Sequence, residues 1–413
     1  MNVLVVNAGS SSLKYQLFDT AKGDVIAKGV CERIGDAMGD ITHKVPGREP
    51  YHASLPMKNH DVATDILVKT LTDPKLGVLS SIDDIEAVGH RIVHGGAYFS
   101  ESVLVDDEVL AKMEKCRAIA PLHTGPALMG IHGCMSVMPK IPQVLVFDTA
   151  FHQTMPKKAY TYAIPAALAK KHQIRRYGFH GTSHRFVSGE MLKILGRTEG
   201  TKLIVCHLGN GSSISAIKDG KVIDTTMGFT PLDGLMMGTR SGAIDPAIVP
   251  FLMEQEHISP ADMNLFLNKQ CGLGGVSEYS SDFRDLEAAW TKDGNEQAGL
   301  AIEMLAYQIK KYIGGFVAAL DGLDALVFTA GIGENHGLRG YALSRSGTGS
   351  VRKRSHPRRK RHYEIVHRCI ESIGLYDPHK RGTGDCFRYG ETCTLLKISP
   401  RKQYALPVNY AEE

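Results

Sequence analysis

Residues 3–13 read VLVVNAGSSSL, and residues 203–213 read LIVCHLGNGSS. Each stretch is an apolar run that predicts a buried strand, followed by a polar turn rich in glycine, serine or both. An alternating strand follows the turn and ends at Asp19 in the first copy and at Asp219 in the second. The copies begin 200 positions apart, so we expect two related domains that open with the same strand–turn–strand unit.

These turns indicate ligand binding. Small residues after a buried strand let a ligand approach the backbone closely, and successive N–H groups in such a turn suit anions, above all phosphate. A third glycine turn, at residues 329–334, follows an expected strand at 325–328. One such turn alone is more often an ordinary turn. Three of them favour phosphate binding, and a nucleotide-handling enzyme over a structural module.

The pattern from residue 1 to residue 335 alternates between strands and helices, which predicts α/β domains. We expect further strands at residues 85–93 and 144–147, and helices at 61–71, 106–118, 165–172 and 297–320. Residues 238–242 (GTRSG) are expected to form a flexible loop, and residues 272–275 (GLGG) a plain loop. Asp245 and Pro246 predict the N-cap and the first residue of the next helix.

Composition excludes several classes of protein. The chain has 413 residues, 43% hydrophobic and 22% charged, which is ordinary for a globular protein and long enough for two or three domains. It contains no apolar run of membrane-spanning length and no basic leader, and its eight cysteines form no C-x-x-C pair. We therefore expect a cytoplasmic protein with reduced thiols and no membrane partner.

Positive charge is concentrated late in the chain. Residues 336–381 hold twelve Lys or Arg against three Asp or Glu, whereas the whole chain carries only +4, so the remainder is mildly acidic. That balance argues against a general nucleic-acid binder. The run VRKRSHPRRKRH at 351–362 has three interpretations: a solvated basic loop, a nuclear-import or RNA-binding patch, or an out-of-frame stretch of coding sequence.

Several familiar motifs are missing or incomplete. No G-x-G-x-x-G follows a strand and no G-x-x-x-x-G-K-[ST] occurs, which weakens a dinucleotide-dehydrogenase reading and excludes a P-loop. The pairs His90/His94 and His180/His184 have the spacing of two zinc ligands on a helix, but the first lies in an expected strand and the second includes a glycine. Single polar or catalytic roles, or packing, suit these histidines better.

Two arginines and an aspartate are candidates for chemistry. Arg91 lies near the end of an expected buried strand, and Arg240 lies in the 238–242 loop. A buried arginine is costly unless it faces an anion, so the pair suggests clamps on an anionic substrate or phosphoryl group. An internal salt bridge would explain either one alone equally well. Asp148 follows strand 144–147, where α/β proteins usually bind ligands, although a turn or N-cap aspartate is also common.

Eight short motifs, taken together, resemble the acetokinase family of acetate kinases, in the sugar kinase, Hsp70 and actin superfamily. They are NAGSSSLK (7–14), GHRIVHGG (89–96), APLH (120–123), FDTAFHQTM (147–155), RYGFHGTSH (176–184), HLGNG (207–211), GTRSG (238–242) and FTAGIGEN (328–335). The resemblance implies two duplicated actin-like, ribonuclease H-like domains around a nucleotide cleft. Residues 1–150 would be the N-terminal domain, completed by the extreme C-terminus, and residues 151–400 the C-terminal nucleotide-binding domain.

The resemblance also implies roles for individual residues. The catalytic set would be Arg91, Asp148, His180 and Arg240, and the substrate-binding set Arg91, Val93, Leu122, His123, Phe179 and Pro231. The ATP-binding set would be Lys14, His207, Leu208, Gly209, Asn210, Gly211, Asp282, Phe283, Arg284, Ala330, Gly331, Ile332, Gly333 and Glu334. The metal ligands would be Asn7 and Glu412, which would hold Mg²⁺, or Mn²⁺ in its place.

The implied reaction is reversible transfer of the γ-phosphoryl group of ATP to acetate, which gives acetyl phosphate and ADP by in-line displacement in a homodimeric enzyme. A carboxylate is already ionised at neutral pH, so alignment and charge neutralisation are what remain to be supplied. We expect Asp148 to orient the metal or its water rather than to remove a proton. The alternatives are a propionate or butyrate kinase, since a methylene is worth only about 1–3 kcal/mol of discrimination, and a non-catalytic ATP-dependent clamp.

The chain departs from the family in two places. His123 is followed by Thr-Gly-Pro where the family usually has Asn-Pro. After Asn335 the family continues to a Pro-Thr-Asn-Glu-Glu motif with a metal-binding glutamate, whereas residues 336–400 here are atypical and only LPVNYAEE at 406–413 echoes that motif. Glu412 is the nearest counterpart of that glutamate. This mismatch is why we favour an out-of-frame origin for the basic run.

Overall fold

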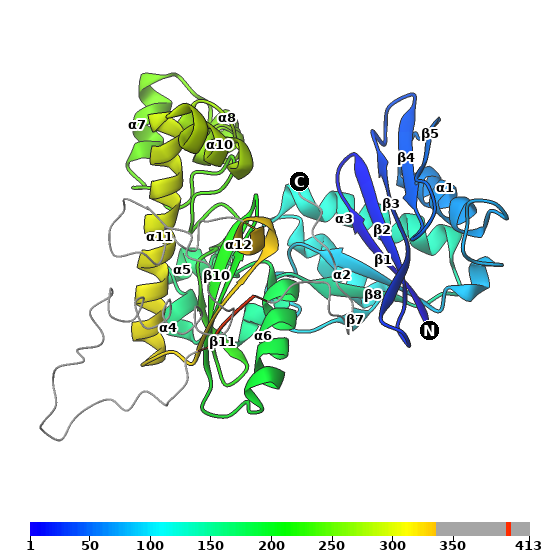
Figure 1. The fold of residues 1–413 in the computed structure, drawn as a ribbon, viewed down its shortest axis with the longest axis horizontal. Helices are drawn as coiled ribbons and strands as arrows, with labels where there is room; N and C mark the ends of the chain where they lie inside the picture. The colour runs from blue at the N-terminus through cyan, green and yellow to red at the C-terminus, as the bar shows by residue number, and fades with distance from the viewer. Residues whose placement is uncertain (336–393, 398–413) are drawn as a thin grey trace, which may run out of the picture. The chain divides into compact units, whose positions relative to one another are not determined.

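The computed structural model describes residues 1–335 and strand β13 (Thr394–Lys397) (Figure 1). The described residues form two compact units. Unit 1 contains Met1–Gln153 and Ile164–Ile174, and unit 2 contains Thr154–Ala163 and residues 175–335 with β13. The basic run at 351–362 and Glu412 lie outside the described residues, as does the rest of the atypical 336–400 segment apart from β13.

Unit 1 is built on an eight-stranded mixed sheet with the order β5-β4-β3-β2-β1-β6-β8-β7. Its strands are β1 (Asn2–Ala8), β2 (Ser12–Asp19), β3 (Asp24–Glu32), β4 (Gly39–Lys44), β5 (Tyr51–Leu55), β6 (Ala87–Ile92), β7 (Val103–Leu104) and β8 (Gln143–Phe147). Strand β1 pairs antiparallel with β2 and parallel with β6, and β6 pairs parallel with β8. The carboxyl ends of β1, β6 and β8 therefore meet at one edge of the sheet.

Helices cover the unit 1 sheet. They are α1 (His60–Thr72), α2 (Asp107–Cys116) and α3 (Pro121–Val137). Unit 1 also contains the short helix α5 (Ala166–Lys171) and the 3-10 turns η1 (Ile82–Asp84) and η2 (Ala150–Thr154). Leu4, Leu17 and Leu67 are fully buried in the core between the sheet and α1. Helix α3 crosses β1 so closely that a Cβ on Gly130 would lie 2.5 Å from Ala8 Cβ, which explains the glycine there.

Unit 2 has a five-stranded sheet with the order β11-β10-β9-β12-β13. Its strands are β9 (Lys202–Leu208), β10 (Ser212–Lys218), β11 (Lys221–Thr225), β12 (Ala325–Thr329) and β13. Its helices are α4 (Lys157–Tyr160), α6 (Gly181–Leu195), α7 (Ile248–Gln255), α8 (Pro260–Lys269), α9 (Gly272–Ser277), α10 (Phe283–Asp293), α11 (Glu296–Leu320) and α12 (Ala330–Asn335). None of the helices in the described ranges is long and apolar enough to cross a membrane.

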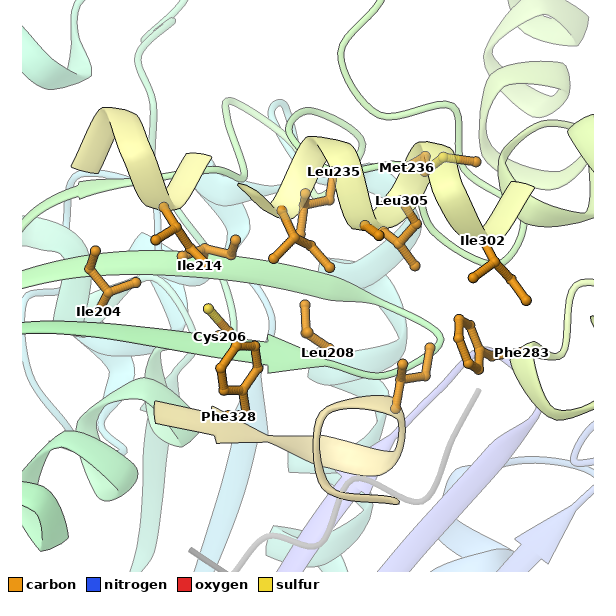
Figure 2. Packing of buried hydrophobic residues seen from close by; sticks show 14 of the residues in the cluster. Ile204, Cys206, Leu208, Ile214, Leu235, Met236, Phe283, Ile302, Leu305 and Phe328 are labelled. Atoms are coloured by element: carbon orange, nitrogen blue, oxygen red, sulfur yellow. The ribbon is translucent and has the colours of Figure 1, made fainter. Parts of the chain in front are cut away.

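The long helix α11 supplies much of the unit 2 core. Its buried side chains recur at helical spacing, and Ile302 and Leu305 face the sheet in Figure 2. Ile214 of β10, Cys206 of β9 and Phe328 of β12 belong to the same cluster. This packing fixes the ends of β9 and β12, from which the candidate site of this unit is built.

The two units repeat one topology, as the duplicated sequence predicts. In unit 2, β9 pairs antiparallel with β10 and parallel with β12, just as β1 pairs with β2 and β6 in unit 1. The turns correspond as well: Gly9 N donates to Ser12 O at 2.8 Å, and Gly209 N donates to Gly211 O at 3.1 Å. The prediction of duplicated α/β units is confirmed.

The predicted helices and strands all form, with ends shifted by a few residues, but three local predictions are wrong. Residues 329–334 are not a turn, because β12 leads directly into α12 at Ala330, whose φ of 66° makes the change of direction. Residues 272–275 form the start of α9 rather than a loop. Asp245 caps a turn by accepting from Ala247 N at 2.9 Å, and α7 begins later, at Ile248.

Candidate active site

A buried ion pair lies at the carboxyl edge of the unit 1 sheet. Arg91 lies one residue before the end of β6, and Asp148 directly follows β8. The guanidinium donates through Nε to Asp148 Oδ1 at 3.3 Å and through Nη2 to Oδ2 at 2.8 Å. The Asp148 side chain is 1% exposed and that of Arg91 12%, so each charge offsets the burial cost of the other.

Parallel pairing of β6 and β8 brings these residues together. Arg91 is in register with Val146, and Asp148 N donates to Ile92 O at 2.8 Å, which carries the pairing one residue past the strand. The internal salt bridge that one interpretation of Arg91 foresaw is therefore present. Asp148 therefore holds the Arg91 guanidinium, which is more than the role of a turn or N-cap residue.

Two buried histidines flank the ion pair without adding charge. His90 bonds Gln143 Oε1 through Nε2 at 2.8 Å, and burial lowers its pKa to about 4. Burial also lowers the pKa of His152 to about 4, partly offset by a hydrogen bond with the Asp148 backbone. Both imidazoles are neutral at pH 7. The zinc-type pairing needs both histidines on one helix face, but His90 lies in β6 and His94 lies beyond the end of that strand, where its Nδ1 accepts from Gly96 N at 2.9 Å.

Asn7 and Lys14 face each other across the β1–β2 hairpin. They are partners in the antiparallel register, one step from the Gly9–Ser12 turn. His60, the first residue of α1, bonds the carbonyl oxygen of Gly9 at 2.8 Å and so fixes the turn from outside. Asn7 therefore lies at the same sheet edge as Arg91 and Asp148, because β1 and β6 run parallel.

The start of α3 carries the next candidates. Leu122 is 73% exposed, and His123 and Val93 are half-buried. Pro121 begins the helix, and Pro126 inside it has no N–H to donate to the Leu122 carbonyl. Thr124, which stands where the family usually has asparagine, is buried, and its hydroxyl has no hydrogen-bond partner among the described residues.

In unit 2, His180 begins helix α6 in a strained backbone conformation. Its φ of 58° is left-handed, and its side chain does not cap the helix. Instead its Nδ1 bonds Ser213 Oγ at 2.8 Å. Ser213 Oγ also bonds His184 Nε2 at 2.7 Å, and Ser183 Oγ bonds His207 Nδ1 at 2.8 Å. The four-residue spacing of His180 and His184 therefore lets both imidazoles bond the same serine hydroxyl, that of Ser213.

Two nitrogen donors converge on the glycine turn after β9. A Cβ built on Gly211 would lie 3.4 Å from His180 Nε2 and 3.5 Å from Arg240 Nη1. The His180 and His207 rings are tilted against each other with centroids 4.3 Å apart. Arg240 Nη1 also contacts Met237 Sδ at 3.6 Å. The turn thus has an imidazole and a guanidinium beside exposed backbone, an arrangement suited to anionic oxygens.

The 238–242 loop is tied to this turn by its backbone. Gly238 N donates to Asn210 O at 3.0 Å, and a Cβ on Gly238 would collide with Asn210 Oδ1. Hydrogen bonds from Cys271 N to Thr239 O and from Leu273 N to Met237 O hold its other side. The loop that we predicted to be flexible is therefore held by backbone hydrogen bonds on two sides, and these bonds position Arg240.

The remaining predicted ATP-binding residues of unit 2 divide into two kinds. Leu208, Phe283 and Ile332 are buried in the core, so their side chains position the turns from inside. The Asp282 carboxylate caps α10 by accepting a hydrogen bond from Arg284 N at 2.8 Å, and it also forms a salt bridge with the exposed Arg284 guanidinium. Glu334 Oε1 accepts from Thr329 Oγ1 and Ala330 N, which fixes the start of α12. Pro231 is half-buried.

Ser213 and Ser183 were not among the residues predicted from sequence. The sequence did contain a signal for these residues, because Ser213 ends the repeated motif and His180 and His184 are spaced four residues apart. Spacing within one segment suggested a metal site, however, and could not show a partner 33 residues away. In the described ranges no group of three or more His, Cys, Asp or Glu is placed to hold a metal ion.

Comparisons with known proteins agree on one family. The profile described as "Acetokinase family" matches residues 2–343. Acetate kinase of Caldanaerobacter subterraneus subsp. tengcongensis is 54% identical over 336 residues, which are 81% of this chain and 84% of that protein. Acetate kinase 2 of Clostridium perfringens is 50% identical over 346 residues, 84% of this chain and 87% of that protein.

Solved structures give the same result. The structure of Porphyromonas gingivalis acetate kinase has a TM-score of 0.80 and 41% identity, and the match covers 96% of both chains. A propionate kinase from Francisella tularensis has a TM-score of 0.77 and 42% identity, and covers 83% of this chain and 87% of that one. The two neighbours differ little in similarity although their names give different acids.

Proposed function

Because the chain belongs to the acetokinase family, we propose that it reversibly transfers the γ-phosphoryl group of ATP to acetate, which yields acetyl phosphate and ADP. The single structural observation that supports this best is the convergence of His180 Nε2 and Arg240 Nη1 beside Gly211. Phosphoryl transfer needs donors that neutralise equatorial oxygens, and it needs no strong base when the acceptor is an ionised carboxylate.

The bond changes are simple. One acetate oxygen attacks the γ-phosphorus, and the bond from that phosphorus to the β–γ bridging oxygen breaks in line, so ADP leaves with the electron pair. In unit 2 we assign His180 and Arg240 to the transferring oxygens. We assign the turn at 207–211 and the start of α12 at 330–334, with Asp282, Phe283 and Arg284, to ATP.

In unit 1 we assign Arg91 to the substrate carboxylate and Lys14 to the nucleotide phosphates. A guanidinium recognises a carboxylate as a two-pronged donor, and the bidentate bond to Asp148 fixes the plane of that fork. We assign Val93, Leu122 and His123 of this unit to the substrate as well, and Phe179 and Pro231 of unit 2. Phe179 is 1% exposed, so it would act as a rigid apolar surface.

We also propose that the reaction uses Mg²⁺, with Mn²⁺ as a substitute. Amide and carboxylate oxygens are the ligands these ions prefer, and Asn7 and Asp148 place such oxygens at one edge of the unit 1 sheet. The ion would neutralise phosphate charge when bound. Glu412, the remaining ligand expected from the sequence, lies outside the described residues.

Two further proposals concern the state of the protein. Leu300, Met304 and Tyr307 lie on one face of α11 and are 44%, 36% and 65% exposed, which supports a homodimer that covers this face. The cysteines of the described part are thiols that form no disulfide, which supports a cytoplasmic enzyme; they are Cys31, Cys116, Cys134, Cys206 and Cys271. We also propose that residues 1–150 and 151–400 act as the two functional domains.

Trapping of acetyl phosphate as its hydroxamate tests the function. The full chain with Mg²⁺ and ATP should form hydroxamate from acetate, with kcat/KM higher for acetate than for propionate or butyrate. A preference for the longer acids would support the propionate or butyrate alternative instead. ATP binding without any acyl phosphate would support the non-catalytic clamp and overturn the proposal.

A further inference from the structure

Ser213 lies at the centre of a buried hydrogen-bond chain that no assigned role explains. It belongs to β10, its side chain is fully buried, and its Oγ has two imidazole nitrogens as partners. One is His180 Nδ1 at 2.8 Å and the other is His184 Nε2 at 2.7 Å. His184 is also fully buried. Both distances are those of full hydrogen bonds.

A serine hydroxyl carries one hydrogen, so the chain has a direction. When Ser213 donates to one ring, it can only accept from the other. If it donates to His180 Nδ1, then His180 in its neutral form carries its proton on Nε2. His184 Nε2–H then donates to Ser213, so that both bonds between the hydroxyl and the two imidazoles are made. Reversal of the chain would move the His180 proton to Nδ1 and leave Nε2 as an acceptor.

The surroundings of His180 Nε2 select one direction. This nitrogen and Arg240 Nη1 converge on the turn at Gly211. A guanidinium only donates, so an anionic oxygen that binds there is held by both groups only when Nε2 carries a proton. A second positive charge on the imidazole is disfavoured by the nearby Arg240. The His207 imidazole also lies against this ring, with ring centroids 4.3 Å apart, and His184 shares Ser213 with it.

We propose that Ser213 is a positioning residue that holds His180 as the neutral Nε2–H tautomer and aims that N–H at the transferring phosphoryl group. The proposal rests on the proposed phosphoryl transfer. The strained φ of 58° at His180 fits this role, because a left-handed residue at the start of α6 turns its side chain away from the helix. The bond to Ser213 then fixes where the ring points.

The first test needs no catalysis. The wild-type protein, labelled with ¹⁵N in histidine, is examined by long-range ¹H–¹⁵N NMR at neutral pH, with His180→Gln and His184→Gln spectra for assignment. The proposal predicts a neutral Nε2–H tautomer for both rings. An Nδ1–H tautomer or an imidazolium at His180 would overturn it, whether or not the protein makes acetyl phosphate.

The second test uses Ser213→Ala with Ser215→Ala as its matched control. Ser215 lies two residues along β10, is equally buried, and bonds Thr225 Oγ1 at 2.9 Å. We expect kcat to fall about ten- to a hundredfold in Ser213→Ala, with the KM values for ATP and acetate within about threefold, because only the transition-state contact is impaired. Ser215→Ala should stay within about twofold of wild type.

The outcomes separate this proposal from the proposed function. A wild-type enzyme that makes no acetyl phosphate refutes the function, and the NMR result still decides the tautomer. An active enzyme whose Ser213→Ala variant keeps wild-type kcat, or changes only KM, refutes the role of Ser213. Equal losses in the two serine variants would show a purely structural effect and refute it as well. If Ser213→Ala does not fold, the wild-type spectrum decides.

Discussion

The two units share one scaffold but differ in what they place at the ends of their strands. Both open with an antiparallel hairpin and add a parallel strand beside its first member. At the unit 1 edge lie opposite charges, Arg91 and Asp148, in a bidentate pair. At the unit 2 edge lies a chain of hydroxyl and imidazole groups around Ser213, with Arg240 beside it.

This difference shows which parts of a duplicated fold are constrained. The hairpin and its glycine turn recur because a buried strand that ends in a tight turn needs the same backbone path in each unit. In unit 1 the charged groups come from strands outside the hairpin, β6 and β8. In unit 2 the histidines come from helix α6 and its N-cap, the arginine comes from the 238–242 loop, and Ser213 comes from the hairpin strand β10 itself. An ion pair therefore holds the side chains of the unit 1 site in place, whereas the direction of the hydrogen bonds through Ser213 sets the side-chain orientation in the unit 2 site.

The largest effect is expected from Arg240→Ala. If Arg240 neutralises the transferring phosphoryl group, kcat should fall on the order of 10³–10⁵-fold, as when an arginine finger is removed. Thermal unfolding of the variant is measured as well, so that a loss of folding is distinguished from a loss of turnover. Steady-state kinetics and calorimetry check both points. Near-normal turnover would remove Arg240 from the assigned role.

Arg91→Ala should impair both activity and folding. Turnover should fall on the order of 10²–10³-fold, and the free energy of unfolding by about 3–5 kcal/mol, because Asp148 is left as an uncompensated buried charge. Arg91→Lys should recover part of the stability but not full activity, since a point charge cannot form the fork. Unchanged stability of Arg91→Ala would contradict the role given to the ion pair with Asp148.

Acidification should weaken unit 1 through its buried histidines. The pKa of His90 is about 4 in the folded state and its ordinary value is 6.5, so the unfolded state binds its proton first. Stability is then full above about pH 6.5 and declines toward pH 4. The loss from pH 7 to pH 5 should be about 2 kcal/mol for this group. Urea unfolding of wild type and His90→Asn at both pH values measures it, and an equal loss in the two proteins would contradict the assignment.

The smallest effect is expected at the start of α10. Asp282→Ala removes the cap on Arg284 N and should lower the free energy of unfolding by about 1 kcal/mol. Asp282→Asn keeps an acceptor and should lose less. If Asp282 also serves ATP, both variants should raise the KM for ATP while kcat changes little. An unchanged KM for ATP in both variants would show that Asp282 only caps α10 and does not contribute to ATP binding.

Strand and helix positions were the more predictable part of this molecule. Apolar runs and helical spacing placed β6, β8, α1 and α11 within a few residues, because those patterns report burial directly. The errors fell where glycine and proline dominate. Residues 272–275 and 329–334 carry two or more glycines each, which signal turns, yet core packing makes them helical in α9 and α12.

The candidate site was predictable as a set of residues but not as contacts. Glycine turns and strand-end charges identified Arg91, Asp148 and Arg240 one by one. The bond between Arg91 and Asp148 joins residues 57 positions apart and depends on the parallel pairing of β6 with β8. Ser213 was missed for the same reason, since nothing local to it shows the two imidazoles that its hydroxyl joins.

The central claim is that a carboxylate oxygen attacks the γ-phosphorus of ATP directly. The most direct measurement is ³¹P NMR of the full-length protein with Mg²⁺, ATP and acetate labelled with ¹⁸O in both oxygens. Direct transfer predicts ADP and acetyl phosphate in equal amounts, with the acyl phosphate resonance shifted by one bridging ¹⁸O. ADP accompanied only by unlabelled inorganic phosphate, or no turnover at all, would contradict the account.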